Sequence, residues 1–285
     1  MKKVTNKNLQ DAKKAKNDEF YTRIEDIEKE LTHYQDQLEG KWVYSPCDDF
    51  RWSQFRTYFR NNFEELGLSH YTCTCYDLGD GAWRYDYDGE KETAIRMEGN
   101  GDFQSEECTK IKDECDIVIT NPPFSKFKVF MNWMEGKDFI VVGNKNAMLW
   151  KTIFPRYFYK ELYFGYNYIS KFRLPDDTFN WFQGSGRWFT TFPTPKDNPP
   201  LQLVEYDPER HKRYDTYNAI NTDSIKDVPD LKDIEIGVPI GIIDYINPEQ
   251  FEITGMLCRG SGDIDKAKPI IDGKHLYSRV LIKRK

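Results

Sequence analysis

A short apolar run that stops at two prolines constrains the fold of this chain more than any other feature. Ile117-Val118-Ile119-Thr120 leads directly into Asn121-Pro122-Pro123-Phe124. A run without polar alternation is typical of a strand that is buried on both faces, as in a parallel sheet. Proline fixes φ and has no N–H to donate, so the strand must end there. The sequence therefore predicts a buried parallel strand that leads into a rigid turn.

Helical and extended patterns alternate around this strand. Apolar residues recur at spacings of three and four over 24–38 and 55–66, which indicates two amphipathic helices. Strands are expected at 42–45, 71–75, 116–120 and 139–143. Because strands and helices alternate across residues 40–145, we predict an α/β fold with an open sheet.

Two further strand pairs are expected. Asp88-Gly89 is a turn signal for a hairpin within 79–92. Residues 161–192 are aromatic-rich and are interpreted as two strands, with Gly184-Ser185-Gly186 as their flexible tip.

Four prolines between 193 and 200 predict a stiff connection between domains. We therefore expect a first domain over residues 1–195, in which residues 1–21 form an N-terminal arm. Residues 196–285 form a second domain, whose topology the sequence does not define.

The charges are unevenly distributed. The chain has a net charge of -6, but residues 76–116 carry -8 and residues 126–200 carry +5. The basic stretch also holds 20 of the 44 aromatic residues. Basic and aromatic side chains together suit a groove for a stacked, polyanionic ligand. The same aromatic residues also suit a hydrophobic core.

Composition argues against membrane and metal-binding classes. The sequence contains no run of about 18 apolar residues, which a membrane-spanning helix needs. Its start lacks the apolar core of a signal peptide. The six cysteines form no CxxC pair and there are four histidines, so we expect no metal site. A cytoplasmic protein is expected.

The turn at Asn121-Pro122-Pro123-Phe124 is the candidate catalytic motif. Ligands of open α/β sheets bind at the carboxyl ends of strands, where this turn lies. The prolines remove two N–H donors, so the nearby carbonyls and the Asn121 side chain present acceptors. Two acceptors suit an exocyclic amine, and Phe124 offers a flat face for the ring that bears it. This arrangement favours methyl transfer to an amine.

The motif has the form (Asn/Asp)-Pro-Pro-aromatic, which is typical of methyltransferases that modify amino groups with S-adenosylmethionine (SAM). Over nearly its whole length the chain resembles the EcoRI-type adenine-specific DNA methyltransferase family, which includes phage and prophage members. The segments that carry the resemblance are Asn17-Asp18-Glu19-Phe20-Tyr21-Thr22, Asn121-Pro122-Pro123-Phe124, Gly237-Val238-Pro239-Ile240, Pro248-Glu249-Gln250-Phe251 and Leu276-Tyr277-Ser278-Arg279.

The resemblance implies a Rossmann-like, mostly parallel SAM-dependent methyltransferase sheet, with residues 196–285 as the target-recognition region. It implies catalytic roles for Asn121, Pro122, Pro123 and Phe124. The residues that it implies for cofactor binding are Phe20 and Cys47, Asp48 or Asp49 for the methionine part, Asp77 for the ribose, and Asp102 and Phe103 for the adenine. Carboxylates suit a cofactor that carries a sulfonium and an ammonium.

One segment departs from the family pattern. The glycine-rich turn expected after strand 42–45 is absent, and Ser45-Pro46-Cys47-Asp48-Asp49 stands in its place. Glycines normally let the backbone approach a cofactor closely. Which residues contact the cofactor here is therefore left to the structure.

The predicted function is methyl transfer from SAM to N6 of an adenine that is flipped out of double-stranded DNA. Arg187 and Trp188 are candidates to line the base pocket, and core packing is the alternative for Trp181, Phe182 and Trp188. A cognate restriction endonuclease is the expected functional partner, unless the enzyme acts alone. Two alternatives stay open: methylation of cytosine N4, an RNA base or protein glutamine, and a catalytically inactive nucleic-acid-binding protein of the same fold.

Overall fold

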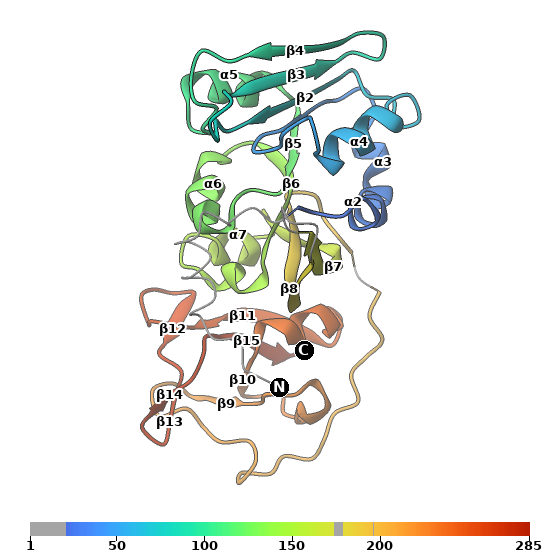
Figure 1. Ribbon diagram of the computed structural model, residues 1–285. Coiled ribbons are helices and arrows are strands. Elements are labelled where there is room, and N and C mark those ends of the chain that lie inside the picture. Colours follow the sequence, from blue (N-terminus) through green and yellow to red (C-terminus); the bar gives the residue numbers. More distant parts are fainter. Residues whose placement is uncertain (1–20, 174–178, 196) are drawn as a thin grey trace. The chain divides into compact units, whose positions relative to one another are not determined.

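The chain forms two compact units (Figure 1). The computed structural model describes residues 21–173, 179–195 and 197–285. Lys145–Leu162 and Pro193–Lys285 form the second unit, and the rest of the chain forms the first. The main crossing into the second unit thus falls at Pro193, where the proline-rich connection begins. No feature of the sequence indicates that Lys145–Leu162 belong to the second unit.

The first unit is built on an eight-stranded sheet with the order β4-β3-β2-β1-β5-β6-β8-β7. Its strands are β1 (Trp42–Ser45), β2 (His70–Cys75), β3 (Trp83–Tyr87), β4 (Glu92–Arg96), β5 (Ile117–Thr120), β6 (Asp138–Asn144), β7 (Tyr163–Arg173) and β8 (Phe179–Thr190). The four central strands, β2, β1, β5 and β6, are parallel to one another. The other four pair antiparallel and form the two edges. The open α/β sheet with a buried parallel strand before the double proline is confirmed.

Helices cover both faces of this sheet. They are α2 (Ile24–Leu31), α3 (Gln35–Leu38), α4 (Gln54–Asn61), α5 (Glu106–Glu114) and α6 (Phe127–Trp133), with the 3-10 turns η1 (Thr32–Tyr34) and η2 (Phe124–Lys126). Figure 1 shows α5 and α6 on one side of the sheet and α2, α3 and α4 on the other. Serine caps begin α4 and α5: Ser53 accepts from Arg56 N and Ser105 from Cys108 N. The three-layer arrangement follows from amphipathic helices that pack against both faces of the sheet.

The expected flexible tip at Gly184-Ser185-Gly186 is wrong. The strand pair exists as β7 and β8, but these residues lie inside β8. Gly186 is paired with Asn144 on one side and Ile169 on the other. A Cβ atom at Gly186 would lie 2.5 Å from the Ile169 carbonyl oxygen. The glycine is thus required for close approach of the strands rather than for a turn.

The expected hairpin turn at Asp88-Gly89 is confirmed between β3 and β4. Trp188 is buried in the main hydrophobic cluster, which agrees with its core-packing interpretation. Arg187 is 1% exposed and lies over the Tyr168 ring, 4.1 Å from its centroid. Neither residue is accessible from outside in this structure.

The second unit contains a separate five-stranded sheet with the order β12-β11-β15-β10-β9. Its elements are η3 (Lys145–Leu149), α7 (Phe154–Phe158), β9 (Ala219–Asn221), η4 (Ile225–Asp227), β10 (Glu235–Val238), η5 (Ile240–Tyr245), β11 (Phe251–Leu257), β12 (Asp265–Ala267), β13 (Ile270–Ile271), β14 (Lys274–His275) and β15 (Arg279–Arg284). Among the described residues, no helix is long and apolar enough to cross a membrane.

A buried carboxylate joins α2 to β7 in the first unit. Glu30 is fully buried, and its Oε1 accepts from Tyr34 OH at 3.0 Å and Tyr166 N at 2.8 Å. Its Oε2 accepts from Asn167 N at 2.8 Å and Asn167 Nδ2 at 3.0 Å. The register of β7 against β8 shifts between Phe164 and Tyr168, so this stretch lacks regular sheet pairing. Glu30 supplies the acceptors that the sheet does not.

Candidate active site

The candidate site lies at the carboxyl ends of the central parallel strands. β1 pairs with β2 on one side and with β5 on the other, so the strand order reverses direction at β1. Ligands of open α/β sheets bind at such a reversal. The loops that follow β1, β2 and β5 carry Asp48, Asp77 and Asn121 respectively.

Hydrogen bonds tie the β1 loop to the end of β5. Ser45 Oγ donates to the Ile119 carbonyl at 2.6 Å, and Thr120 Oγ1 lies 2.6 Å from Asp48 Oδ2. Asp48 Oδ1 accepts from Ser53 Oγ at 3.0 Å, at the beginning of α4. The carboxyl group of Asp48 is therefore held by Thr120, the residue that directly precedes the Asn-Pro-Pro-Phe turn. Thr120 and Ser53 are site-forming residues that the sequence analysis missed.

Burial governs the ionisation of this loop. Desolvation raises the pKa of Asp48 to about 7, although Thr120 and Ser53 partly oppose the shift. Burial, with Asp48 close by, also raises the pKa of the Cys47 thiol well above its usual range. Cys47 has a positive φ of 66°, a conformation that normally favours glycine, at the place where the glycine-rich turn is missing.

We expect the stability of the protein to fall as pH rises from about 4 to about 7, because of Asp48. Its carboxyl keeps a proton in the folded state that the unfolded chain has lost in this window. Asp48→Asn should remove roughly 2–4 kcal/mol of this decline, because the amide cannot ionise. The free energy of unfolding in urea, measured at several pH values, tests this. Asp77→Asn, used as a control, should retain the decline; an unchanged slope in Asp48→Asn would refute the assignment.

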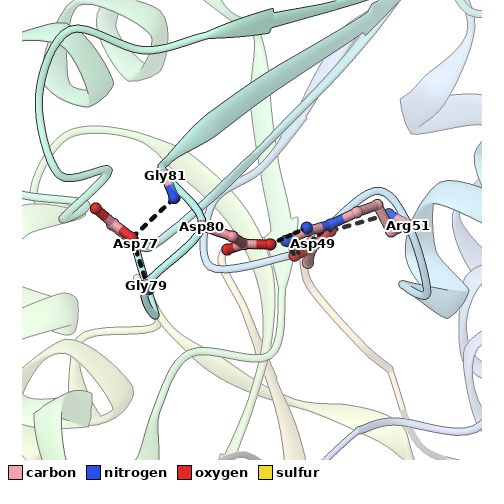
Figure 2. A network of polar contacts seen from close by, with 6 residues as sticks. All are labelled: Asp49, Arg51, Asp77, Gly79, Asp80 and Gly81. Carbon is pink, nitrogen blue, oxygen red and sulfur yellow. Dashed lines mark hydrogen bonds and ion pairs between the residues drawn. The ribbon is translucent and has the colours of Figure 1, made fainter.

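The Asp49 carboxylate, next to Asp48 in the chain, forms an ion pair with an arginine. Figure 2 shows that Arg51 bridges the Asp49 and Asp80 carboxylates, and so joins the β1 and β2 loops. Arg51 Nε lies 2.8 Å from Asp49 Oδ1, and its backbone N–H also donates to that atom. Because Arg51 already neutralises Asp49, Asp48 is the better candidate for a ligand's ammonium group.

Asp77 follows β2 and organises its own loop. Its Oδ1 accepts from the backbone N–H groups of Gly79 at 2.7 Å and Gly81 at 2.9 Å (Figure 2). These two bonds lower the pKa of Asp77. Its Oδ2 accepts no hydrogen bond from any residue that the structure describes.

Lys126 joins the Asp102 loop to the Asn-Pro-Pro-Phe turn. Its Nζ lies 2.8 Å from Asp102 Oδ2, while Asp102 Oδ1 accepts from Gln104 N at 3.0 Å. Burial alone would raise the pKa of Asp102, but these two contacts lower it overall. Phe103 is 3% exposed and packs against Phe130, with 5.2 Å between the ring centroids. Lys126 carries no sequence signal of this role, since it lies outside the four-residue motif.

The two prolines of the Asn-Pro-Pro-Phe turn differ in the hydrogen bonding of their carbonyls. The Pro123 carbonyl accepts from Lys126 N at 2.9 Å, whereas no described residue donates to the Pro122 carbonyl. Asn121 is partly exposed at the end of β5. Phe124 is partly buried and meets the edge of Phe172, with 5.5 Å between centroids and an interplanar angle of 87°. Among the described residues, the Pro122 carbonyl is therefore left without a donor.

The first described residue of the chain pairs with the end of β7. Tyr21 pairs antiparallel with Arg173, with backbone hydrogen bonds of 2.9 and 3.0 Å. Arg173 follows Phe172, the residue that supports Phe124. Phe20 itself lies outside the described residues. Tyr21 thus pairs with β7, the strand whose Phe172 ring contacts Phe124.

The structure thus places most of the predicted site residues at the carboxyl ends of the central parallel strands. Asp48 is linked to Thr120, and Asp102 is linked through Lys126 to the turn after β5. Asp77 lies at the end of the neighbouring strand β2, and Asp49 is engaged by Arg51. Among the described residues, no group of three or more metal-ligating side chains occurs.

This sheet, with an Asn-Pro-Pro-Phe turn at the carboxyl end of a central strand, defines a Rossmann-like methyltransferase fold. The family described as "Adenine-specific methyltransferase EcoRI" matches residues 8–94 and 84–285. The chain belongs to this family and is a site-specific DNA adenine methyltransferase.

Curated relatives match over nearly the full length of both chains. The Type II methyltransferase M.MgeORF184P of Mycoplasma genitalium is 32% identical, over 96% of this chain and 97% of its own. M.EcoRI of Escherichia coli is also 32% identical, over 99% and 98%. M.MpnI of Mycoplasma pneumoniae is 30% identical, over 96% and 97%. No solved structure gives a significant match.

Proposed function

We propose that the protein transfers a methyl group from SAM to N6 of an adenine flipped out of double-stranded DNA. The observation that carries this proposal is the connection of three loops at one sheet edge, through Thr120 to Asp48 and through Lys126 to Asp102. These contacts hold candidate cofactor groups beside a turn that presents acceptors for an amine. A DNA-modifying enzyme of this kind would work in the cytoplasm.

The residues present fit SAM. Asp48 is a desolvated carboxyl whose ionised form needs a cation, and the ammonium group of SAM is one. Asp77 Oδ2 would accept from the ribose hydroxyls, and Asp102 from the adenine amine. Phe103 would support the Asp102 loop from within the core, and the segment with Phe20 would cover the methionine part. When bound, SAM supplies a methyl group activated by a sulfonium.

The turn after β5 would position the target base. The Asn121 side-chain oxygen and the Pro122 carbonyl would each accept one N–H of the adenine amine. Both acceptors lie on one side of the nitrogen, which directs its lone pair toward the methyl donor. Phe124 would stack on the ring, while Phe172 holds Phe124 from the side. Positioning and fixed dipoles would supply most of the rate enhancement.

We propose residues 196–285 as the target-recognition region, as the sequence suggests. Lys145–Leu162 would join them, because these residues pack in the same compact unit. The segment follows β6 directly, so the recognition unit is connected to the catalytic sheet at β6 as well as at Pro193.

The test is modification-sensitive sequencing of DNA from cells that express the protein, with an Asn121→Ala variant as the matched control. The expected result is N6-methyladenine at one short sequence with the wild type alone. Modified cytosine, or no modified DNA base, would contradict the proposal.

Phe124→Ala should weaken capture of the flipped base by about 1–3 kcal/mol, which is the usual contribution of one stacked base. SAM affinity, measured by calorimetry, should stay nearly unchanged, since the ring is assigned to the base. Phe124→Trp keeps a stacking face and should retain most of the DNA affinity. Equal losses of DNA and SAM affinity in Phe124→Ala would indicate a folding defect instead.

A further inference from the structure

We propose that Arg259, on the loop between β11 and β12, is a DNA contact of this enzyme, and that Asp265 is the positioning residue that holds this loop. The inference rests on the proposed function, because it takes double-stranded DNA as the substrate. It adds a specific recognition residue in a region for which the sequence motifs identified none.

The loop is fixed by a buried carboxylate. Asp265 is 6% exposed and accepts from the backbone N–H groups of Cys258 at 2.9 Å, Arg259 at 3.0 and 3.1 Å, and Gly260 at 3.1 Å. Ser261 Oγ also donates to it at 3.1 Å. Three consecutive amides directed at one side chain leave the backbone of Arg259 little freedom. Gly260 has a positive φ of 70°, which a residue with a side chain adopts only with strain.

The same bonds leave the charge of Arg259 uncompensated. A carboxylate offers about four lone-pair positions, and the loop amides and Ser261 occupy those of Asp265. Arg259 is exposed and forms no ion pair with any residue of the described part of the chain. A desolvated carboxylate is costly to bury, so its use to hold this loop points to a loop whose conformation matters.

The other arginines of residues 201–285 differ from Arg259. Arg210 pairs with Asp227, Arg279 with Asp223 and Arg284 with Asp230, while Arg213 donates to Asn218. Across the described residues of this region, only the Arg259 guanidinium lacks a partner. Three of these arginines are therefore neutralised by a carboxylate, and Arg259 is not.

The overall charge supports a contact in this unit. By composition the first unit carries a net charge of -7 and the second +1. The net negative charge of the first unit gives a polyanion no general attraction, so specific cations in the second unit would contribute to binding. A guanidinium presents a planar fork of donors that matches two phosphate oxygens, or O6 and N7 of guanine. A rigid loop lowers the entropy lost when such a fork is ordered.

The experiment compares Arg259→Ala with Arg210→Ala, an exposed arginine of the same unit that Asp227 already neutralises. DNA affinity is measured by fluorescence anisotropy over a range of salt concentrations, with cognate and scrambled duplexes. Arg259→Ala should weaken cognate binding about tenfold or more, and Arg210→Ala should change it little. SAM affinity should be the same in both variants and in the wild type.

The pattern of loss identifies the contacted group. Loss on both duplexes, with a salt slope lower by about one, indicates a phosphate contact. Loss confined to the cognate duplex, with methylation of relaxed sequence context, indicates a guanine contact. Unchanged affinity and salt slope in Arg259→Ala, with an active wild type, would overturn this inference alone. A wild type that methylates no duplex would overturn the proposed function and this inference with it.

Asp265→Asn tests the positioning role. The amide group would turn N–H donors toward the loop amides and release the loop. DNA affinity should fall while Arg259 is present, and the Asp265→Asn/Arg259→Ala double variant should bind no more weakly than Arg259→Ala. Additive losses would show that Asp265 acts independently of Arg259. A thermal melt confirms that the variant is folded.

Discussion

Asn121→Ala is expected to reduce the methyl-transfer rate by about 2–4 kcal/mol of transition-state stabilisation, comparable to the loss of one oxyanion-hole donor. The reason is that the side-chain oxygen of Asn121 and the Pro122 carbonyl are the two acceptors assigned to the adenine amine. With one acceptor removed, the amine is held by a single hydrogen bond, and its lone pair is no longer directed at the methyl donor.

Single-turnover kinetics with a cognate duplex measures this loss without interference from product release. SAM affinity should be retained, because Asn121 lies on the β5 turn and not in the loops that carry Asp48 or Asp77. Asn121→Asp keeps a side-chain oxygen and fits the (Asn/Asp)-Pro-Pro-aromatic pattern, so it should keep more activity than alanine. Full turnover by Asn121→Ala on DNA would disprove the acceptor role.

Glu30→Ala is expected to lower the free energy of unfolding by about 3–6 kcal/mol. The substitution removes the acceptor of Tyr34 OH and of two backbone N–H groups of β7, while the Asn167 side chain keeps only its bond to the Lys29 carbonyl. Each buried donor left without a partner costs about 1–3 kcal/mol, and the losses are less than additive because the groups share one site. Urea unfolding followed by circular dichroism measures the change.

Glu28→Ala provides a matched control, because Glu28 is an exposed glutamate on the same helix. Its effect should stay within about 0.5 kcal/mol. Glu30→Gln should fall between the two, since one oxygen remains but the new NH2 group faces donors. A loss below about 1 kcal/mol for Glu30→Ala would mean that water replaces the carboxylate. Because β7 carries Phe172, the destabilised variant should also bind DNA more weakly.

The repeating pattern of the first unit could be predicted from sequence, because local physics decides it. Continuous apolar runs identify β1, β5 and β6, and spacings of three and four identify α2 and α4. The double proline ends β5 whatever the surrounding tertiary structure, because proline has no N–H to donate to a neighbouring strand. Conversely, Gly184-Ser185-Gly186 was predicted as a tip, since a glycine needed for close strand approach resembles a glycine needed for a turn.

The site divides in the same way. The sequence of this chain determined the turn Asn121-Pro122-Pro123-Phe124, the strand before it and the acidic residues that follow neighbouring strands, because each depends on residues adjacent in the chain. Only the tertiary structure decided that Arg51 neutralises Asp49, that Thr120 holds Asp48 and that Lys126 holds Asp102. These pairs come from loops up to 72 residues apart, and the sheet alone brings them within hydrogen-bonding distance. Burial, which sets the ionisation of Asp48, is likewise a property of the folded chain and not of any local pattern.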